Sequence, residues 1–362
     1  MKLEKTTDLR LPTGVLGLAV GEARRADAST LATALYAACM DGVIYAVDPA
    51  SGTLTPFEGK HASFASGCVL TPDGRTLISA GYDGWLLWHD VTTKRCFRRV
   101  HAHTFWSWQM ALSRDGRRVA TVSGQYLAGG ERYEPAASPE PTVKVYDAVT
   151  GDLVRAFDHG PPVLSVAFGP DGRHVAAANM MGEVRVWDVE TGALAATIAT
   201  PDFTSWGIIK SPHYCGGIYG LAFSPDGGAL LVCGMGPMTD PMAGNGKMTW
   251  QRWDWRTSPP TKLGQIRDGD GGTGLMETLA FAPDGGAFLM AGRQAQGTWT
   301  TALFAAGDGK LVAKLDTKSR VTRAAFTQTA KPSFSPRLSA RGRKNGQWSE
   351  YGRIHVVKVD GT

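Results

Sequence analysis

The chain has 362 residues, and its 45 glycines and 20 prolines are spread along the whole length, which disfavours long helical bundles. A hydrophobic content of 43%, with 11 tryptophans, excludes a disordered chain. The net charge of +5 is mild, and most basic residues alternate with acidic ones, which argues against a dedicated nucleic-acid binder. Composition therefore predicts a turn-rich, all-β globular protein.

The cysteines and the N-terminal segment give expectations about location. The cysteines are odd in number and show no CxxC spacing, so they predict neither a disulfide framework nor a zinc site: Cys39, Cys68, Cys96, Cys215 and Cys233. The first residues lack the apolar core of a signal peptide, and no apolar run approaches the roughly 18 residues of a membrane span. We therefore expect a cytoplasmic protein that makes no contact with a membrane.

A strand-and-turn motif recurs along the chain. An apolar strand leads into Pro-Asp-Gly at residues 72–74, 170–172, 225–227 and 283–285, and residues 114–116 carry Arg-Asp-Gly instead. Proline sets one turn dihedral, aspartate hydrogen-bonds the backbone and glycine accepts positive φ. Each copy therefore predicts a tight turn between two antiparallel strands.

The second half of the repeat is an alternating strand that ends in aspartate and is usually followed by a turn with Thr-Gly. The clearest copies end at Asp147 and Asp188, and weaker ones end at Asp48, Asp90, Asp254 and Asp360. The shortest steps between these aspartates, 41 and 42 residues, give the repeat length. Longer steps must contain insertions.

Together these motifs resemble the WD-repeat β-propeller family, and the resemblance covers essentially the whole chain. The family implies four-stranded antiparallel blades around a central channel. We expect seven blades, with innermost strands near residues 15–20, 66–71, 107–112, 163–168, 218–223, 275–281 and 321–326. Residues 5–11 are predicted to supply the outer strand of the last blade, closing residues 1–362 into a single domain.

In the better members of the family, the resemblance also implies a hydrogen-bonded set of His, Ser or Thr, Asp and Trp within a blade, and blades five to seven of this chain lack it. The register predicts one set from His61, Ser79 and Asp83, with His89 at the Trp position. A second pairs His103 with Thr121. A third has His159 and Trp187, but Ala177 and Met181 replace its polar members. All of these histidines are interpreted as structural.

Insertions beyond the repeat are predicted to gather at one end of the channel. The largest, 125–141, 199–217, 235–247 and 341–352, join second to third strands or one blade to the next, and such loops open on the same end of a propeller. The opposite end is expected to carry only short turns. Insertions on one face of a repeat protein commonly form its binding face.

The inserted-loop end is also rich in aromatic and arginine residues, which suit contacts with a protein or peptide. Some of these side chains would instead anchor their own loops. The candidate contact residues are Phe64, Tyr82, Trp106, Tyr126, Tyr133, Phe203, Trp206, Tyr214, Arg320, Arg341 and Arg343.

No catalytic motif was found: Walker A, GxSxG, HExxH and the protein-kinase set are absent from the sequence. We therefore favour a non-catalytic scaffold or assembly subunit, monomeric by itself and without a cofactor. It would bind a protein or peptide on the inserted-loop face.

Other interpretations stay open. One is a channel-mouth enzyme or small-molecule sensor, for which Glu277 is the clearest channel carboxylate. Another is a platform for nucleic acid or an acidic partner that uses the basic loop 331–353. The methionines of segment 235–242, near Cys233, offer soft ligands for Cu(I), although methionine is also a common hydrophobe of binding surfaces.

Overall fold

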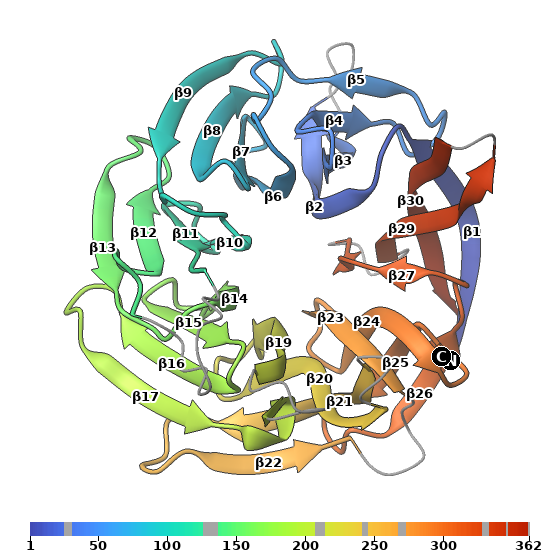
Figure 1. Cartoon of the computed structure of the whole chain (residues 1–362). Coiled ribbons are helices and arrows are strands. Elements are labelled where there is room, and N and C mark those ends of the chain that lie inside the picture. Colours follow the sequence, from blue (N-terminus) through green and yellow to red (C-terminus); the bar gives the residue numbers. More distant parts are fainter. Residues whose placement is uncertain are drawn as a thin grey trace.

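The computed structural model describes residues 1–24, 31–125, 137–206, 214–240, 245–266, 273–327, 333–344 and 347–360. These residues form strands β1 to β30 and a single 3-10 helix, η1 (Pro201–Phe203). Figure 1 shows the strands arranged in sheets around a common axis, with β2, β6, β10, β14, β19 and β23 innermost. The all-β prediction is confirmed.

Four of the sheets consist of four antiparallel strands that follow one another in chain order from the inside outward. The first contains β2 (Val15–Arg24), β3 (Leu31–Cys39), β4 (Ile44–Val47) and β5 (Leu54–Pro56). The second contains β6 (Ala65–Leu70), β7 (Thr76–Gly81), β8 (Trp85–Asp90) and β9 (Cys96–His101). The third contains β10 (Gln109–Leu112), β11 (Arg118–Val122), β12 (Val143–Asp147) and β13 (Leu153–Phe157). The fourth contains β14 (Val163–Phe168), β15 (His174–Asn179), β16 (Glu183–Asp188) and β17 (Leu194–Ala199).

The next sheet departs from the four-stranded pattern, because two sets of strands are joined into nine. The first set is β18 (Thr204–Trp206), β19 (Tyr214–Phe223), β20 (Leu230–Asp240), β21 (Asn245–Asp254) and β22 (Thr261–Gln265). The second is β23 (Thr273–Phe281), β24 (Ala287–Gln296), β25 (Thr301–Ala305) and β26 (Leu311–Leu315). They are joined where β21 pairs with β23, Gly246 opposite Gly274 and Lys247 opposite Thr273.

The last sheet combines both ends of the chain. It contains β27 (Arg320–Val321), β28 (Ala325–Phe326), β29 (Ser333–Lys344), β30 (Gln347–Asp360) and β1 (Lys2–Leu11). Strand β1 pairs antiparallel with β30, from Lys2 opposite Asp360 to Leu11 opposite Gly352. Figure 1 accordingly places the two termini side by side.

The Pro-Asp-Gly turns end the innermost strands as the sequence indicates. In the turn between β6 and β7, Asp73 Oδ1 accepts hydrogen bonds from Thr71 Oγ1 at 2.6 Å and from the Arg75 amide at 3.0 Å. Gly74 has φ 69°, a left-handed conformation that costs glycine little. The same turn chemistry recurs, with φ between 66° and 73°, at Gly116, Gly172, Gly227 and Gly285.

The core lies between the faces of neighbouring sheets. For example, fully buried Trp88 of β8 packs with Tyr146 of β12, and Trp187 of β16 packs with Val145 of β12. Leu9 and Leu11 of β1 pack against the first sheet, whereas Leu3 packs with residues of β24 and β25. Apolar burial therefore ties each sheet to the next along the chain.

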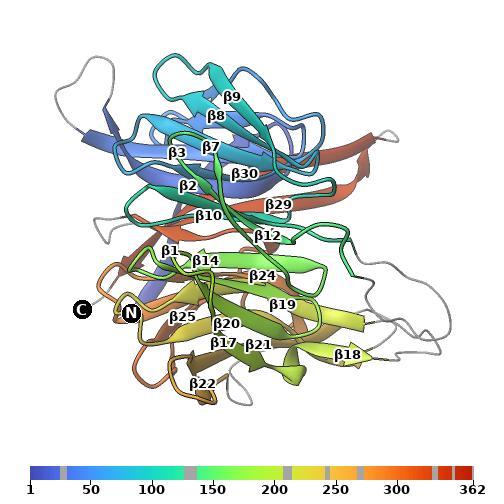
Figure 2. The same ribbon diagram turned by 90° about the vertical axis from the view of Figure 1, so that its left-hand side faces the viewer.

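Two expectations about loops need correction. Segments 235–247 and 341–352, expected as inserted loops, are largely the paired ends of β20 and β21 and of β29 and β30. The end with the Pro-Asp-Gly turns is also not uniformly plain, because β2 and β3 extend there and pair as far as Arg24 opposite Leu31. Figure 2 shows the β2 and β3 hairpin and the β29 and β30 hairpin projecting toward opposite ends of the molecule.

Candidate functional site

Five aromatic side chains meet in one cluster, the aromatic patch: Phe64, Tyr82, Phe105, Trp106 and Trp108. The rings of Tyr82 and Trp106 are stacked, with centroids 4.7 Å apart and planes 3° apart. Phe64 lies 5.7 Å from Tyr82, and Phe105 stacks on Trp106 at 5.1 Å. Phe64 is 38% exposed and Trp106 is 41% exposed, so the patch offers preformed aromatic area to a partner.

Hydrogen bonds to backbone carbonyls help to fix the segments that carry the patch. The Tyr82 amide, in the turn between β7 and β8, donates to the Phe64 carbonyl at 2.8 Å. Trp108, in the segment before β10, donates from Nε1 to the Gly124 carbonyl at 3.0 Å and makes edge contacts with Tyr82 and Trp106. The sequence prediction missed Phe105 and Trp108, although both lie within two residues of Trp106.

An ion pair lies near this patch. Arg320 makes a bidentate contact with Glu277, with Nε to Oε1 at 2.6 Å and Nη2 to Oε2 at 2.9 Å. Glu277 is 5% exposed, whereas the Arg320 side chain is 43% exposed. Burial alone would lower the pKa of Arg320, but the paired carboxylate holds it above its usual value. Glu277 is therefore engaged in a salt bridge, which disfavours its use as a general base.

Arg320 and a second arginine, Arg323, lie close enough to Tyr82 for their charges to act on it. Burial raises the pKa of Tyr82, and the nearby positive charges of Arg323 and Arg320 oppose that rise. The Arg323 guanidinium donates to the Thr322 carbonyl at 2.9 Å. Two cations and one anion within electrostatic range of Tyr82 suit a partner that combines apolar and acidic groups.

One predicted contact residue is wrong. Phe203 is fully buried in η1, where it packs with Ile198 and Ile218, so it anchors its own segment instead of facing a partner. Its polar neighbours Asp202 and Thr204 gave it the local pattern of an exposed loop residue.

The remaining predicted contact residues are less fully described. Trp206 and Tyr214 are opposite each other in the β18 and β19 pair, and only their backbone is described. Tyr126 and Tyr133 lie outside the described residues. Arg341 and Arg343 lie on β29, where Arg341 is opposite Ser349. The basic segment 331–353, expected as a loop, is thus mostly a pair of strands in its described part.

The predicted set around His61 is present. His61 Nδ1 lies 2.9 Å from Asp83 Oδ1, and Nε2 lies 2.9 Å from Ser79 Oγ, which is 3.2 Å from His89 Nε2. Burial would raise the pKa of Asp83, but the hydrogen bond from His61 holds it below its usual value. Burial lowers the pKa of His89 to about 4.

The other two sets differ from the family pattern. Thr121 Oγ1 bonds Ser107 Oγ, and neither ring nitrogen of His103 has hydrogen-bonding geometry to a residue in the described part of the chain. His159 accepts from the Gly160 amide at 3.0 Å, lies 3.2 Å from the Glu183 carbonyl and contacts Trp187 edge-on. Burial lowers the pKa of His103 to about 4 and of His159 to about 3.

The described residues offer little for binding a metal ion or forming a helix that crosses a membrane. Within the described ranges, no three His, Cys, Asp or Glu side chains lie close enough together to hold a metal ion. The described cysteines Cys39, Cys68, Cys96 and Cys233 are free thiols. Met235 is buried, and residues 241 and 242 of the methionine-rich segment fall outside the described ranges. No helix in the described ranges is long and apolar enough to cross a membrane.

Comparison with known proteins finds similarity to proteins with WD repeats. Residues 151–188, which include β13 to β16, match the family model of the WD domain, G-beta repeat. The chain is 26% identical over 171 residues to WD repeat-containing protein SL1-17 of Schistosoma mansoni, covering 46% of this chain and 51% of that protein. It is 28% identical over 203 residues to Telomerase protein component 1 of Mus musculus, covering 56% of this chain and 7% of that protein.

A third relative is Transcription initiation factor TFIID subunit 5 of Caenorhabditis elegans, 30% identical over 108 residues, or 30% of this chain and 14% of that protein. The chain thus spans about half the length of the first of these relatives and much less of the other two. The family match covers the outermost strand of the third sheet and the first three strands of the fourth, and it contains the strand, turn and aspartate pattern found throughout the sequence. The chain therefore resembles WD-repeat proteins, both in the matched repeat and in its similarity to these relatives.

Proposed function

We propose that this chain is a non-catalytic interaction module that binds a protein or peptide through the aromatic patch. It would act as a scaffold or as a subunit of a larger assembly. One relative is named as a subunit of a transcription factor, and WD-repeat relatives generally act as interaction scaffolds or assembly subunits. The fold would be a seven-bladed propeller in which the pairing of β1 with β30 closes the ring. We also propose a cytoplasmic location.

The observation that carries this proposal is the exposed stack of Phe64, Tyr82 and Trp106. Large exposed aromatic side chains that contact one another are unusual on a soluble surface and mark interaction sites. Because these rings already pack against one another and against Trp108, a partner would gain apolar contact at little cost in side-chain entropy. Rigid aromatic anchors of this kind typically carry most of the binding energy of an interface.

The test is affinity capture from the native host with the wild-type chain and with Trp106→Ala, followed by mass spectrometry and a binding titration of each captured protein. Loss of a central aromatic anchor should weaken binding by about 2–4 kcal/mol, or roughly 30-fold or more. The matched control is Trp85→Ala, which removes a tryptophan of similar exposure, 38%, from β8. Equal affinity of wild type and Trp106→Ala, with loss in Trp85→Ala, would place the interface elsewhere.

The charged groups allow the acidic-partner alternative to be tested in the same titration. Binding that used Arg320, Arg323 and the basic strand β29 would weaken steeply with added salt. Binding carried by the aromatic patch alone would change little between about 50 and 200 mM salt.

A further inference from the structure

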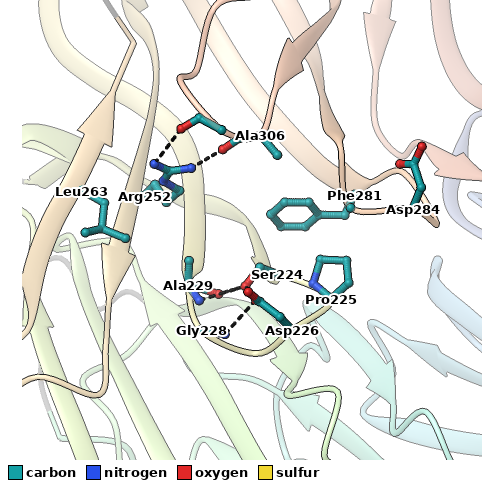
Figure 3. A pocket seen from close by; sticks show the side chains of 12 residues that line it. Ser224, Pro225, Asp226, Gly228, Ala229, Arg252, Leu263, Phe281, Asp284 and Ala306 are labelled. Carbon is teal, nitrogen blue, oxygen red and sulfur yellow. Dashed lines mark hydrogen bonds between the residues drawn. The ribbon is translucent and has the colours of Figure 1, made fainter.

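A cavity of about 520 Å³ opens at the end of the molecule opposite the aromatic patch. It lies between the Pro-Asp-Gly turns that follow β19 and β23, and its walls include Ala229, Arg252, Phe281, Gly285 and Ala306. Figure 3 shows the Phe281 ring on one side of this space and Arg252 and Leu263 on the other. A volume of this size is typical of small-ligand sites.

At the preceding interface, between the sheet of β14 to β17 and strands β19 to β22, an indole occupies the equivalent position. Trp255 is 5% exposed, lies 4.9 Å from His174 and makes an edge contact with Phe223 at 5.7 Å. Its Nε1 donates to the Gly227 carbonyl at 3.0 Å. Trp255 directly follows Asp254, the aspartate that ends β21.

The repeat register relates that filled interface to the cavity residue by residue. Residues 221–227 and 279–285 are copies of the same strand and turn. Phe281 is therefore equivalent to Phe223, and Gly285 is equivalent to Gly227. Ala229 holds the position of His174, and Ala306 holds the position of Trp255. Two large side chains are thus replaced by alanine while the phenylalanine remains, which leaves a space shaped for an aromatic ring.

The carbonyl of Gly285 remains in the cavity as a hydrogen-bond acceptor. Two preceding interfaces supply a side-chain N–H donor to the equivalent glycine carbonyl: Arg118 Nη1 to Gly172 at 3.1 Å, and Trp255 Nε1 to Gly227. No side chain in the described part of the chain is seen to donate to Gly285. A ring with an N–H group would supply that missing donor.

The outer wall of the cavity also deviates from the repeat. Two residues before the strand-ending aspartate, other copies carry Ala46, Trp88, Val145 and Val186, whereas Arg252 stands there in β21. Its guanidinium donates to the carbonyls of Ala306 and Gly307, as Figure 3 shows. A guanidinium fixed in this way offers a planar surface on which an aromatic ring can stack.

Two carboxylates stand at the mouth of the cavity. Asp226 and Asp284 each use Oδ1 to accept a turn amide, from Gly228 and Gly286 respectively, at 2.9 Å. Both side chains belong to exposed residues of the cavity lining. A positive charge carried beside the ring would therefore be favoured, and a negative charge disfavoured.

We propose that this cavity binds an indole ring carried by a cationic molecule, with the ring against Phe281 and Arg252, its N–H donating to Gly285 and the cation near Asp226 and Asp284. The molecule would be a free indole amine or a tryptophan flanked by lysine in a partner peptide. This site lies at the other end of the molecule from the aromatic patch and does not depend on it.

The experiment titrates the full chain, by calorimetry and by NMR, with tryptamine, 1-methyltryptamine, indole-3-propionate and the peptide Lys-Trp-Lys. We expect tryptamine to bind, 1-methyltryptamine to bind about tenfold more weakly because it lacks the ring donor, and indole-3-propionate to bind more weakly still. Tighter binding of the peptide would identify a protein partner as the source, and tighter binding of tryptamine would identify a small molecule.

Two variants test the location. Ala306→Trp should fill the cavity as Trp255 fills its neighbour, abolishing tryptamine binding and raising the melting temperature by roughly 2–4 °C. If Ala306→Trp does not fold, Ala229→His is the alternative variant. It introduces the side chain found at the equivalent position, His174, and should also block tryptamine binding. Trp106→Ala should bind tryptamine as the wild type does. Undiminished binding in a folded filled variant, loss in Trp106→Ala, or no binding of any cationic indole would overturn the proposal.

Discussion

His61 connects side chains from three segments while being only 2% exposed. Its two ring nitrogens are satisfied by Asp83 and Ser79, so the imidazole fixes the turn between β7 and β8 against the segment that precedes β6. Asp83 extends this link by accepting the Ala62 amide at 2.8 Å. Tyr82 directly precedes Asp83, and Phe64 lies three residues after His61. The buried contact between His61 and Asp83 therefore also positions two rings of the aromatic patch.

Replacing Asp83 with alanine should lower the free energy of unfolding by about 2–3 kcal/mol, because it leaves His61 Nδ1 buried without its partner. The measurement is urea unfolding at pH 7. Asp152→Ala, at an exposed position, is the control and should change stability by less than about 0.5 kcal/mol. Similar losses in both variants would show that the buried contact contributes little.

At the scale of elements, β1 is held by more than its backbone pairing with β30. Leu3, Leu9 and Leu11 are each at most 5% exposed and pack in two different core clusters. The Asp8 carboxylate adds a contact to Arg353 at 2.8 Å. This strand therefore connects the last sheet to both of its neighbours.

Deleting residues 1–10 should sharply lower the melting temperature. Loss of the burial of Leu3 and Leu9 alone costs roughly 3–6 kcal/mol, a large part of the stability of an ordinary domain. Circular dichroism during heating measures the change, with Lys5→Ala on the exposed side of β1 as the control. A melting curve identical to that of the wild type would show that β1 does not hold the last sheet in place.

The sequence predicted elements best where turn chemistry is local. Pro-Asp-Gly needs only three residues to define a turn, and each predicted copy lies between the expected strands. The pairing of Gly246 with Gly274 was not predictable, because it joins segments far apart in sequence and involves no patterned side chains. Likewise, Phe64 and Tyr82 could be named from their place at the inserted-loop end, but the burial of Phe203 depends on packing with Ile218 that no local pattern shows.

For the whole molecule, three buried histidines should make stability depend on pH. Burial lowers the pKa values of His89, His103 and His159 to about 4, 4 and 3, below the value near 6.5 of an unfolded histidine. As the pH falls, the histidines of the unfolded chain therefore bind protons at a higher pH than those of the folded chain. The contribution of these groups is fully present above about pH 6.5 and is lost as the pH falls toward 4.

We expect the free energy of unfolding to fall by about 1–3 kcal/mol per histidine between pH 7 and pH 4.5, as measured by urea unfolding across that range. The variant His103→Leu removes one titrating group, which makes no hydrogen bond among the described residues. Its free energy of unfolding should therefore fall less than that of the wild type between pH 7 and pH 4.5. A pH dependence as steep as that of the wild type would mean that His103 is protonated in the folded state.

The stack of Tyr82 on Trp106 also has an optical consequence. Two aromatic chromophores held 4.7 Å apart in nearly parallel planes couple electronically and contribute to the near-ultraviolet circular dichroism. With 41% of its surface exposed, Trp106 is also open to collisional quenchers of fluorescence, unlike Trp88, which is fully buried. Shielding of this emission gives a label-free signal for whatever covers the aromatic patch.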